Sequence, residues 1–143
     1  MRILAIDPGE KRIGLALSDP ERIIASSFGV IIHKAFEEDI LSINKIIIQN
    51  EVSLVVIGQA FDEDGNATPS SRRAVKFGEG LKARFQIEIV YYDESGTTQE
   101  AKQTALLMGL NRKNRRGHLD NLAATILLQR YLDMISVQRE NLL

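Results

Sequence analysis

The chain has 143 residues, of which 44% are hydrophobic and 26% are charged, and its formal net charge is −1. That length suits one domain, and that composition is typical of a folded globular protein and not of a disordered one. Cysteine is absent, which excludes disulfides, thiol nucleophiles and zinc–thiolate sites and fits a cytoplasmic protein. Because the net charge is near zero, a nucleic-acid partner has to be argued from local patches of charge.

The N-terminal segment predicts neither a signal peptide nor a membrane anchor. It meets Asp7 after only four apolar residues, Ile3 to Ile6. No stretch of the chain approaches the roughly 18 uninterrupted apolar residues of a membrane span. We therefore expect one domain over residues 1–143, with a core to about residue 135 and a C-terminal tail over about 136–143.

The first part of the chain predicts three consecutive strands. Residues 2–7 form an apolar run that ends in Asp-Pro-Gly, a pattern typical of a buried strand before a sharp turn. Over residues 13–18, isoleucine and leucines alternate with glycine, alanine and serine, so the second strand has one bulky face and one small face on which a helix can pack closely. After the break at Asp19-Pro20, residues 22–32 predict a third strand, which completes an antiparallel meander.

The remainder predicts alternating helices and strands. Helices are expected over about 35–49, 71–85, 98–110 and 118–135, and buried strands over 54–58 and 87–92. Strands joined through helices run parallel, so the first, fourth and fifth strands should be parallel. The predicted fold is α/β, with a mixed five-stranded sheet made of the three-stranded antiparallel meander plus parallel strands 4 and 5, and with helices on both faces.

Acidic residues lie where these strands end. Open α/β sheets bind ligands beyond the carboxyl ends of their strands. The first strand ends in Asp7, the fifth is followed by Asp93 and Glu94, and the fourth ends in Gly58, which leaves room for a backbone or phosphate to approach. Asp120 lies in the first turn of the last predicted helix, near its apolar stripe. If that helix packs near the first strand, Asp7, Glu94 and Asp120 converge.

These three carboxylates predict a site for Mg²⁺ or Mn²⁺, which take oxygen ligands and keep several waters. Two such ions about 3.5–4 Å apart activate a water and stabilise the leaving oxygen of a phosphodiester. Taken singly, Asp7 is also a common turn residue, Glu94 an ordinary exposed strand end, and Asp120 a partner of the helix dipole. Their placement together at one edge favours the active-site interpretation.

Clusters of cations favour nucleic acid as the partner. Four stand in five positions of a predicted loop, 111–117, directly before the helix that bears Asp120: Arg112, Lys113, Arg115 and Arg116. Such a loop can neutralise phosphates without reading sequence, although an ordinary solvated charge run is the alternative. Lys11 and Arg12, just after Asp7, are a second candidate contact. Arg72 and Arg73, at a helix start, are interpreted as surface residues, with phosphate contact as the alternative.

Other polar residues carry no recognisable site. His33 and His118 are the only histidines and are too far apart in the chain to suggest a ligand pair. His118 is interpreted as a polar residue at a helix start, with help in proton transfer near Asp120 as the alternative. The segment 62–65 is similar to part of a calcium loop, but it lacks the distal bidentate glutamate and is interpreted as a turn. No Gly-x-x-x-x-Gly-Lys-Ser/Thr motif is present, which argues against P-loop nucleotide binding.

At the acidic positions the sequence resembles the YqgF (RuvX) family, bacterial relatives of the RuvC resolvases. The first and most specific block is Ile6-Asp7-Pro8-Gly9-Glu10-Lys11-Arg12-Ile13-Gly14-Leu15-Ala16-Leu17-Ser18-Asp19. Three shorter blocks follow in the family's order, at residues 55–58, 93–101 and 118–124. The resemblance extends from Met1 to about Asp133.

The resemblance implies an RNase H-like fold and nuclease activity on structured nucleic acid, in particular maturation of the 5′ end of pre-16S ribosomal RNA. It also places the family's three acidic positions on Asp7, Glu94 and Asp120. Two departures stand out: Gln59-Ala60 replaces the family's usual Leu-Pro after the fourth strand, and Ser95 replaces an arginine beside Glu94. The second removes a cation from the neighbourhood of a predicted ligand, and neither removes a ligand.

Three functions compete at this point. The first is a metal-dependent nuclease, acting on precursor rRNA or, as the alternative, resolving four-way DNA junctions. The second is a nucleotide-binding protein of the actin and sugar-kinase type, which also has an Asp-x-Gly turn but needs two domains to clasp its ligand. The third is a non-catalytic RNA- or ribosome-binding module that retains a nuclease fold. The sequence leaves the oligomeric state open and favours a monomer, since no extended heptad seam is present.

Overall fold

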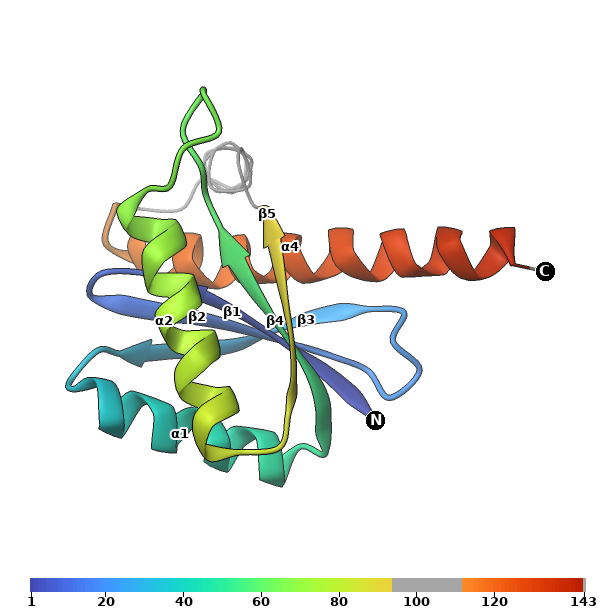
Figure 1. Cartoon of the computed structure of the whole chain (residues 1–143), viewed down its shortest axis with the longest axis horizontal. Helices are drawn as coiled ribbons and strands as arrows, with labels where there is room; N and C mark the ends of the chain where they lie inside the picture. Colours follow the sequence, from blue (N-terminus) through green and yellow to red (C-terminus); the bar gives the residue numbers. More distant parts are fainter. Residues whose placement is uncertain (94–111, 143) are drawn as a thin grey trace.

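The computed structural model describes residues 1–93 and 112–142, with the side chains of the last helix described from residue 122 onward. Its strands are β1 (Arg2–Pro8), β2 (Arg12–Ser18), β3 (Ala25–Ile32), β4 (Val52–Gln59) and β5 (Glu88–Asp93). Its helices are α1 (Phe36–Gln49), α2 (Pro69–Arg84) and α4 (Arg112–Asn141). The strands form one sheet in the order β3-β2-β1-β4-β5, as Figure 1 shows. The helix predicted over 98–110 falls outside the described residues.

The sheet has the predicted mixture of strand directions. β2 pairs antiparallel with both β1 and β3, which is the expected meander. β4 pairs parallel with β1, and β5 pairs parallel with β4, because α1 and α2 carry the chain back across the sheet. The carboxyl ends of β1, β4 and β5 therefore meet along one edge of the sheet.

The third strand begins at Ala25 and not at residue 22 as predicted. The turn before it is held by Asp19, whose Oδ1 accepts hydrogen bonds from the backbone N–H groups of Ile24 at 2.9 Å and Ile23 at 2.7 Å. These bonds stabilise the carboxylate and lower the pKa of Asp19. Arg22 adopts the left-handed region at φ 62°, which turns the chain away from the ladder before β3 starts.

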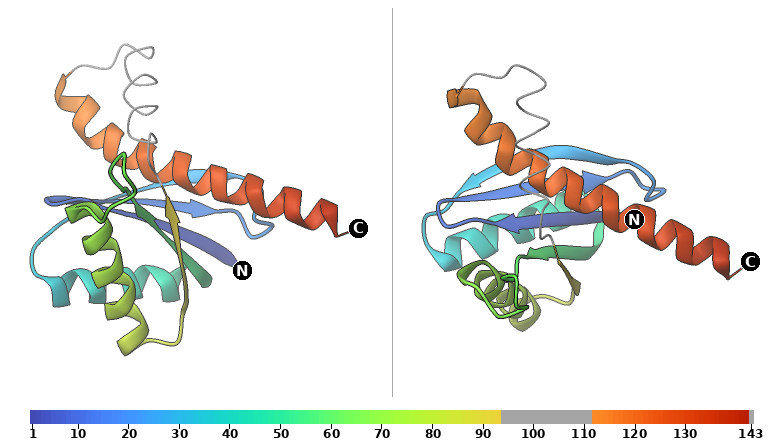
Figure 2. Two further views of the ribbon diagram at one scale, coloured as in Figure 1. Left: turned by 45° about the horizontal axis from the view of Figure 1, so that its top comes forward. Right: turned by 90° about the horizontal axis from the view of Figure 1, so that it is seen from above.

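Helices α1 and α2 cover one face of the sheet. The core between them is formed by alternate residues of the strands, such as Leu4 and Ile6 of β1, together with Ile40, Ile43 and Leu81 of the two helices, all of them fully buried. Alternation along each strand divides its apolar side chains between two cores, one for each face. The prediction of helices on both faces is confirmed, because α4 closes the opposite side (Figure 2).

Helix α4 packs on the small-residue face predicted for the second strand. Its buried residues Ala124, Leu127 and Leu128 meet Ala5 of β1 and Ala16 of β2. Small side chains let the helix lie close to the sheet. No described helix is long and apolar enough to cross a membrane. Ile135 still packs against this core, and beyond it the helix continues toward the C-terminus, where Figures 1 and 2 show it projecting.

The predicted bounds of this helix are wrong at both ends. It extends from Arg112 to Asn141, whereas the sequence predicted a loop over 111–117, a helix over 118–135 and a tail after it. Arginine and lysine are good helix formers, and one interior glycine at position 117 costs only about 1 kcal/mol relative to alanine. Asp120 therefore lies eight residues after Arg112, beyond the first turn in which it was predicted. His118, predicted at a helix start, is likewise inside the helix.

A close contact between α2 and β5 yields a stability prediction. A Cβ added at Gly78 would lie 2.0 Å from the hydroxyl oxygen of Tyr91. That hydroxyl is buried and has no hydrogen-bond partner within the described part of the chain. Burial, with a smaller contribution from Glu79, raises the pKa of Tyr91. The ring of Tyr91 packs against the core beneath α1 and α2, whereas its hydroxyl makes no hydrogen bond with the described residues.

We expect Gly78→Ala to lower the free energy of unfolding by about 1–2 kcal/mol, because overpacking exceeds the gain in helix propensity. Tyr91→Phe alone should cost less than about 0.5 kcal/mol or stabilise the fold, since it removes an unsatisfied hydroxyl. The double variant should recover part of the stability, because the closest clashing atom is gone. Urea denaturation of the three variants measures all these values. Strictly additive changes would contradict the contact.

Candidate metal centre and nucleic-acid interface

At the carboxyl edge of the sheet, Asp7 lies level with a glycine of the neighbouring strand β4. The register of β1 on β4 pairs Ile6 with Ile57, so Asp7 is level with Gly58, and Gly58 in turn pairs with Tyr92 of β5. Gly58 is buried and has no side chain to separate Asp7 from β5. The room expected there for a backbone or phosphate stays a prediction.

Strand alternation directs Asp7 toward the face covered by α4. Ile3 and Ala5 of β1 belong to the core beneath α4, whereas Leu4 and Ile6 belong to the core beneath α1 and α2. The Asp7 side chain follows the odd positions and is half-buried. Tyr92 packs on the same face, where its ring meets that of Tyr131 of α4 edge to face with centroids 6.2 Å apart.

The N-terminal end of α4 lies on the same side of the molecule as the turn between β1 and β2 (Figures 1 and 2). Position 120 precedes the buried Ala124 by one helical turn. The backbone that carries Asp120 thus belongs to the half of the helix nearest the end of β1. The Asp120 side chain and the whole of Glu94 lie outside the described residues, and Glu94 is bonded directly to Asp93, the last residue of β5.

The turn after Asp7 has a tight geometry that only glycine permits. The N–H of Gly9 donates to the carbonyl oxygen of Arg12 at 2.9 Å, and a Cβ on Gly9 would lie 2.4 Å from that oxygen. The turn places the exposed Lys11 and the half-buried Arg12 directly beyond the end of β1. Both cations proposed from the sequence as a second nucleic-acid contact are therefore at the carboxyl edge.

The main basic cluster is helical and not a loop. The first two turns of α4 contain its four members, Arg112, Lys113, Arg115 and Arg116. The first turn contains no acidic residue. Their backbone lies toward the same side of the molecule as the β1–β2 turn (Figure 2). The prediction of a loop was wrong because a run of charges does not indicate secondary structure, and Arg and Lys are good helix formers.

The loop between β4 and α2 is shaped by its own polar groups. Asp62 Oδ1 accepts from the N–H groups of Asp64 at 3.0 Å and Asn66 at 2.7 Å, which confirms the predicted turn. Thr68 caps α2: its hydroxyl accepts from the N–H of Ser71, and the Ser71 hydroxyl accepts from the N–H of Thr68. This capping box and Pro69 at the first helical position begin α2 at 69, two residues earlier than predicted.

One arginine of α2 reaches the end of β1. The Nε of Arg73 donates to the carbonyl oxygen of Pro8 at 3.2 Å, across 65 residues of chain. The sequence predicts Arg72 and Arg73 together as surface residues, whereas the structure separates them, since Arg72 is exposed and Arg73 is half-buried. The sequence could have indicated this contact, because the first turns of a helix that follows β4 lie near the carboxyl edge of the sheet.

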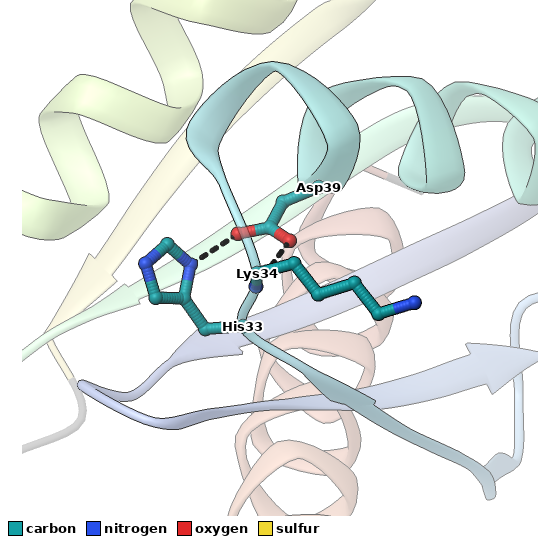
Figure 3. A network of polar contacts seen from close by, with 3 residues as sticks. All are labelled: His33, Lys34 and Asp39. Carbon is teal, nitrogen blue, oxygen red and sulfur yellow. Dashed lines mark hydrogen bonds and ion pairs between the residues drawn. The ribbon is translucent and has the colours of Figure 1, made fainter.

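A second polar contact joins the end of β3 to α1, as Figure 3 shows. The ring Nδ1 of His33 bonds to Oδ2 of Asp39, a carboxylate with 1% exposure, and the N–H of Lys34 donates to Oδ1 of the same residue at 3.3 Å. The N–H of His33 donates to the carbonyl oxygen of Lys11 at 2.9 Å. Asp39 therefore holds the β3–α1 corner against the turn that follows Asp7.

The donor chemistry of the predicted site suits a hard divalent cation. Asp7, Glu94 and Asp120 offer only carboxylate oxygens, the ligands that Mg²⁺ and Mn²⁺ prefer. Among the described residues, no group of three or more His, Cys, Asp or Glu side chains comes together to hold a metal. The three-carboxylate site therefore depends on two residues whose side chains the structure does not describe.

Sequence comparison places the chain among known proteins. The sequence model of a family described as "RuvX: Holliday junction resolvase" matches residues 1–134. A protein of Caldanaerobacter subterraneus subsp. tengcongensis, named "Putative pre-16S rRNA nuclease", is 38% identical over 134 residues, which cover 93% of this chain and 96% of that protein. A protein of Syntrophus aciditrophicus with the same name is 37% identical over 139 residues, 97% of this chain and 93% of that protein.

Solved structures of other proteins share the fold of this chain. RuvC of T. thermophilus, solved with a Holliday junction substrate, has a TM-score of 0.60 at 16% identity, covering 94% of this chain and 96% of that one. The Holliday junction resolvase of fowlpox virus has a TM-score of 0.56 at 15% identity, covering 94% and 99% of the two chains. At these identities the similarity concerns the fold alone, and it confirms the predicted RNase H-like architecture.

Proposed function

Since the chain belongs to the RuvX family, we propose that it is a nuclease that hydrolyses phosphodiester bonds in structured nucleic acid, with precursor 16S ribosomal RNA as its substrate. The observation that carries this proposal is the position of Asp7. It is the last residue but one of the central strand β1, level with the side-chain-free Gly58, on the face that α4 covers. Family membership argues against the actin-type nucleotide-binding alternative, which needs a second domain.

We propose Asp7, Glu94 and Asp120 as the ligands of Mg²⁺ or Mn²⁺. Support for Glu94 comes from covalent geometry, because its Cα lies about 3.8 Å from that of Asp93, the last residue of β5 at the carboxyl edge. Support for Asp120 comes from its backbone on the half of α4 nearest the end of β1. Two divalent ions bound there would supply a water of lowered pKa and stabilise the leaving oxygen.

Asp7→Asn should abolish cleavage and weaken Mn²⁺ binding while leaving the melting temperature within a few degrees, because it removes a ligand charge at nearly constant shape. Glu94→Gln and Asp120→Asn should behave in the same way. Cleavage assays with limiting Mn²⁺, together with electron paramagnetic resonance of the bound ion, provide the two readouts. Asp64→Asn, which changes an exposed carboxylate of the β4–α2 loop, is the matched control. Wild-type turnover by any ligand variant would remove that residue from the site.

We also propose the basic start of α4, together with Lys11 and Arg12, as the nucleic-acid interface. Cations in the first turns of a helix oppose the positive end of its dipole, at a cost of about 0.3–1 kcal/mol each near the terminus. The first turn of α4 contains Arg112, Lys113 and Arg115 and no acidic residue to offset them. A bound polyanion removes this repulsion, which favours phosphate binding over a merely solvated charge run.

Replacing Arg112, Lys113, Arg115 and Arg116 with alanine should weaken RNA binding across sequences and flatten its dependence on salt. Removing one phosphate-binding cation should change the log–log salt slope by roughly 0.7–0.9. Fluorescence anisotropy with labelled RNA at several salt concentrations measures the slope. Lys45→Ala/Lys82→Ala, which removes exposed lysines from α1 and α2, is the control. An unchanged slope in the quadruple variant would assign these residues to the solvated surface.

Two features favour ribosomal precursor RNA over a four-way DNA junction. The relatives with 37–38% identity over nearly the whole chain are named for pre-16S rRNA, whereas the proteins solved with junctions share only the fold. Symmetric resolution of a junction also requires two active sites in a fixed relation, usually through a two-fold dimer. We propose a cytoplasmic monomeric enzyme of one domain, for which a single two-metal site suffices to cut one RNA strand.

With Mn²⁺ and equal salt, the protein should cleave a fragment spanning the 5′ end of pre-16S rRNA at least about tenfold faster than a four-way DNA junction, a difference of about 1.4 kcal/mol in barrier. Light scattering should give the mass of one chain. A stable dimer that makes paired, symmetric cuts in the junction and ignores the precursor RNA would contradict the proposal. Specific RNA binding without any metal-dependent cleavage would instead identify a non-catalytic module.

A further inference from the structure

Arg73 occupies an unusual place for a helix residue assigned to the surface. It is half-buried, and its Nε is fixed by the carbonyl oxygen of Pro8 at 3.2 Å. Pro8 is bonded to Asp7 and belongs to the turn that Gly9 closes onto Arg12. The guanidinium is therefore attached to the backbone one residue from the proposed metal ligand, between the capped start of α2 and the turn that Gly9 closes.

The contact described for Arg73 is the hydrogen bond to the Pro8 carbonyl oxygen, whereas the ion pairs described in residues 1–93 join His33 to Asp39 and Arg84 to Glu37. An arginine can bury its methylene stem while the guanidinium stays open to water and to anions. The Pro8 carbonyl occupies one of the five N–H donors of the guanidinium. A planar fork of this kind matches the oxygens of a phosphate.

Arg73 approaches the edge from the face opposite to the proposed metal site. Asp7 follows the odd positions of β1 toward α4, whereas α2 packs on the core formed by Leu4 and Ile6. The basic start of α4 cannot reach this side without crossing the sheet edge. A nucleic-acid strand that contacted both would have to pass over the ends of β1 and β4, with Lys11 and Arg12 in the turn between them.

We propose, on the basis of the nuclease function above, that Arg73 binds a phosphate of the substrate that flanks the cleaved bond on the α2 side of the sheet edge. Its hydrogen bond to Pro8 orients the guanidinium for this contact. The substrate strand then crosses the edge, with one part held by the start of α4 and the other by Arg73. This role differs from that of Arg72, which is adjacent in sequence but exposed on α2.

The test measures binding in an Asp7→Asn background, so that cleavage does not interfere. The probe is a fluorescein-labelled RNA spanning the 5′ end of pre-16S rRNA. We expect Arg73→Gln to weaken binding about tenfold and to lower the salt slope by about 0.7–0.9, the signature of one phosphate left without its cation. Arg73→Lys should keep the salt slope and bind with intermediate affinity. Arg72→Gln, which removes the same charge one residue away, should change the affinity less than twofold.

A second readout locates the contact. Single methylphosphonate linkages, which carry no charge, are placed along the RNA one at a time. Neutralising the contacted phosphate should weaken binding by the Arg73 form and have little further effect on Arg73→Gln. If Arg73 only fastens α2 to β1, the glutamine variant will have a lower melting temperature, and every methylphosphonate will cost it as much as the parent protein. Should Arg73→Gln fail to fold, Arg73→Lys takes its place: a smaller cost at one linkage than in the Arg73 form supports the contact, and equal costs at every linkage overturn it.

Failure of the nuclease function gives a different result. Protein with Asp7 intact that binds the RNA but shows no metal-dependent cleavage would overturn the proposed activity and leave the Arg73 contact standing if the scan reveals it. Cleavage without any Arg73-dependent phosphate would overturn the contact alone. Absence of binding to this RNA and to a four-way DNA junction would overturn both.

Discussion

Strand β1 is hydrogen-bonded on both sides, antiparallel to β2 and parallel to β4, and the position of its last residues controls the rest of the site. The turn that follows can close only because Gly9 has no Cβ, which would lie 2.4 Å from the carbonyl oxygen of Arg12. Arg73 of α2 and His33 at the end of β3 both donate to carbonyl oxygens of this same turn. A rearrangement of the turn would therefore move Asp7, two cations and both neighbouring elements together.

The two faces of the sheet contribute different chemistry to the one edge. On the α4 face, alanines in β1 and β2 let the helix approach closely, and the half of α4 that carries position 120 lies toward the end of β1. On the other face, the capping box at Thr68 sets where α2 begins and hence which of its residues reaches Pro8. Close packing thus serves the proposed metal site, and helix capping serves the proposed phosphate contact.

By the resemblance drawn from the sequence, Ser95 stands where the family is expected to have an arginine, beside the predicted ligand Glu94. Arg73 brings a guanidinium to the same edge of the sheet from another element. A site that binds a phosphodiester needs cations around it more than it needs them at one particular position, because phosphate contacts act largely through charge.

Period-two alternation and strand-end carboxylates were enough to predict the five strands, their directions, the two covered faces and the edge on which Asp7 lies, because these follow from local pattern and chain connectivity. The start of α4 was predicted wrongly, since a glycine inside a basic run favours a loop, whereas the arginines and the lysine around it are good helix formers. No local pattern could show that Arg73 meets Pro8 or that His33 meets Asp39. The first of these contacts joins residues 65 positions apart. Only the packing of α2 and α1 against the sheet decides which donor reaches which carbonyl or carboxylate.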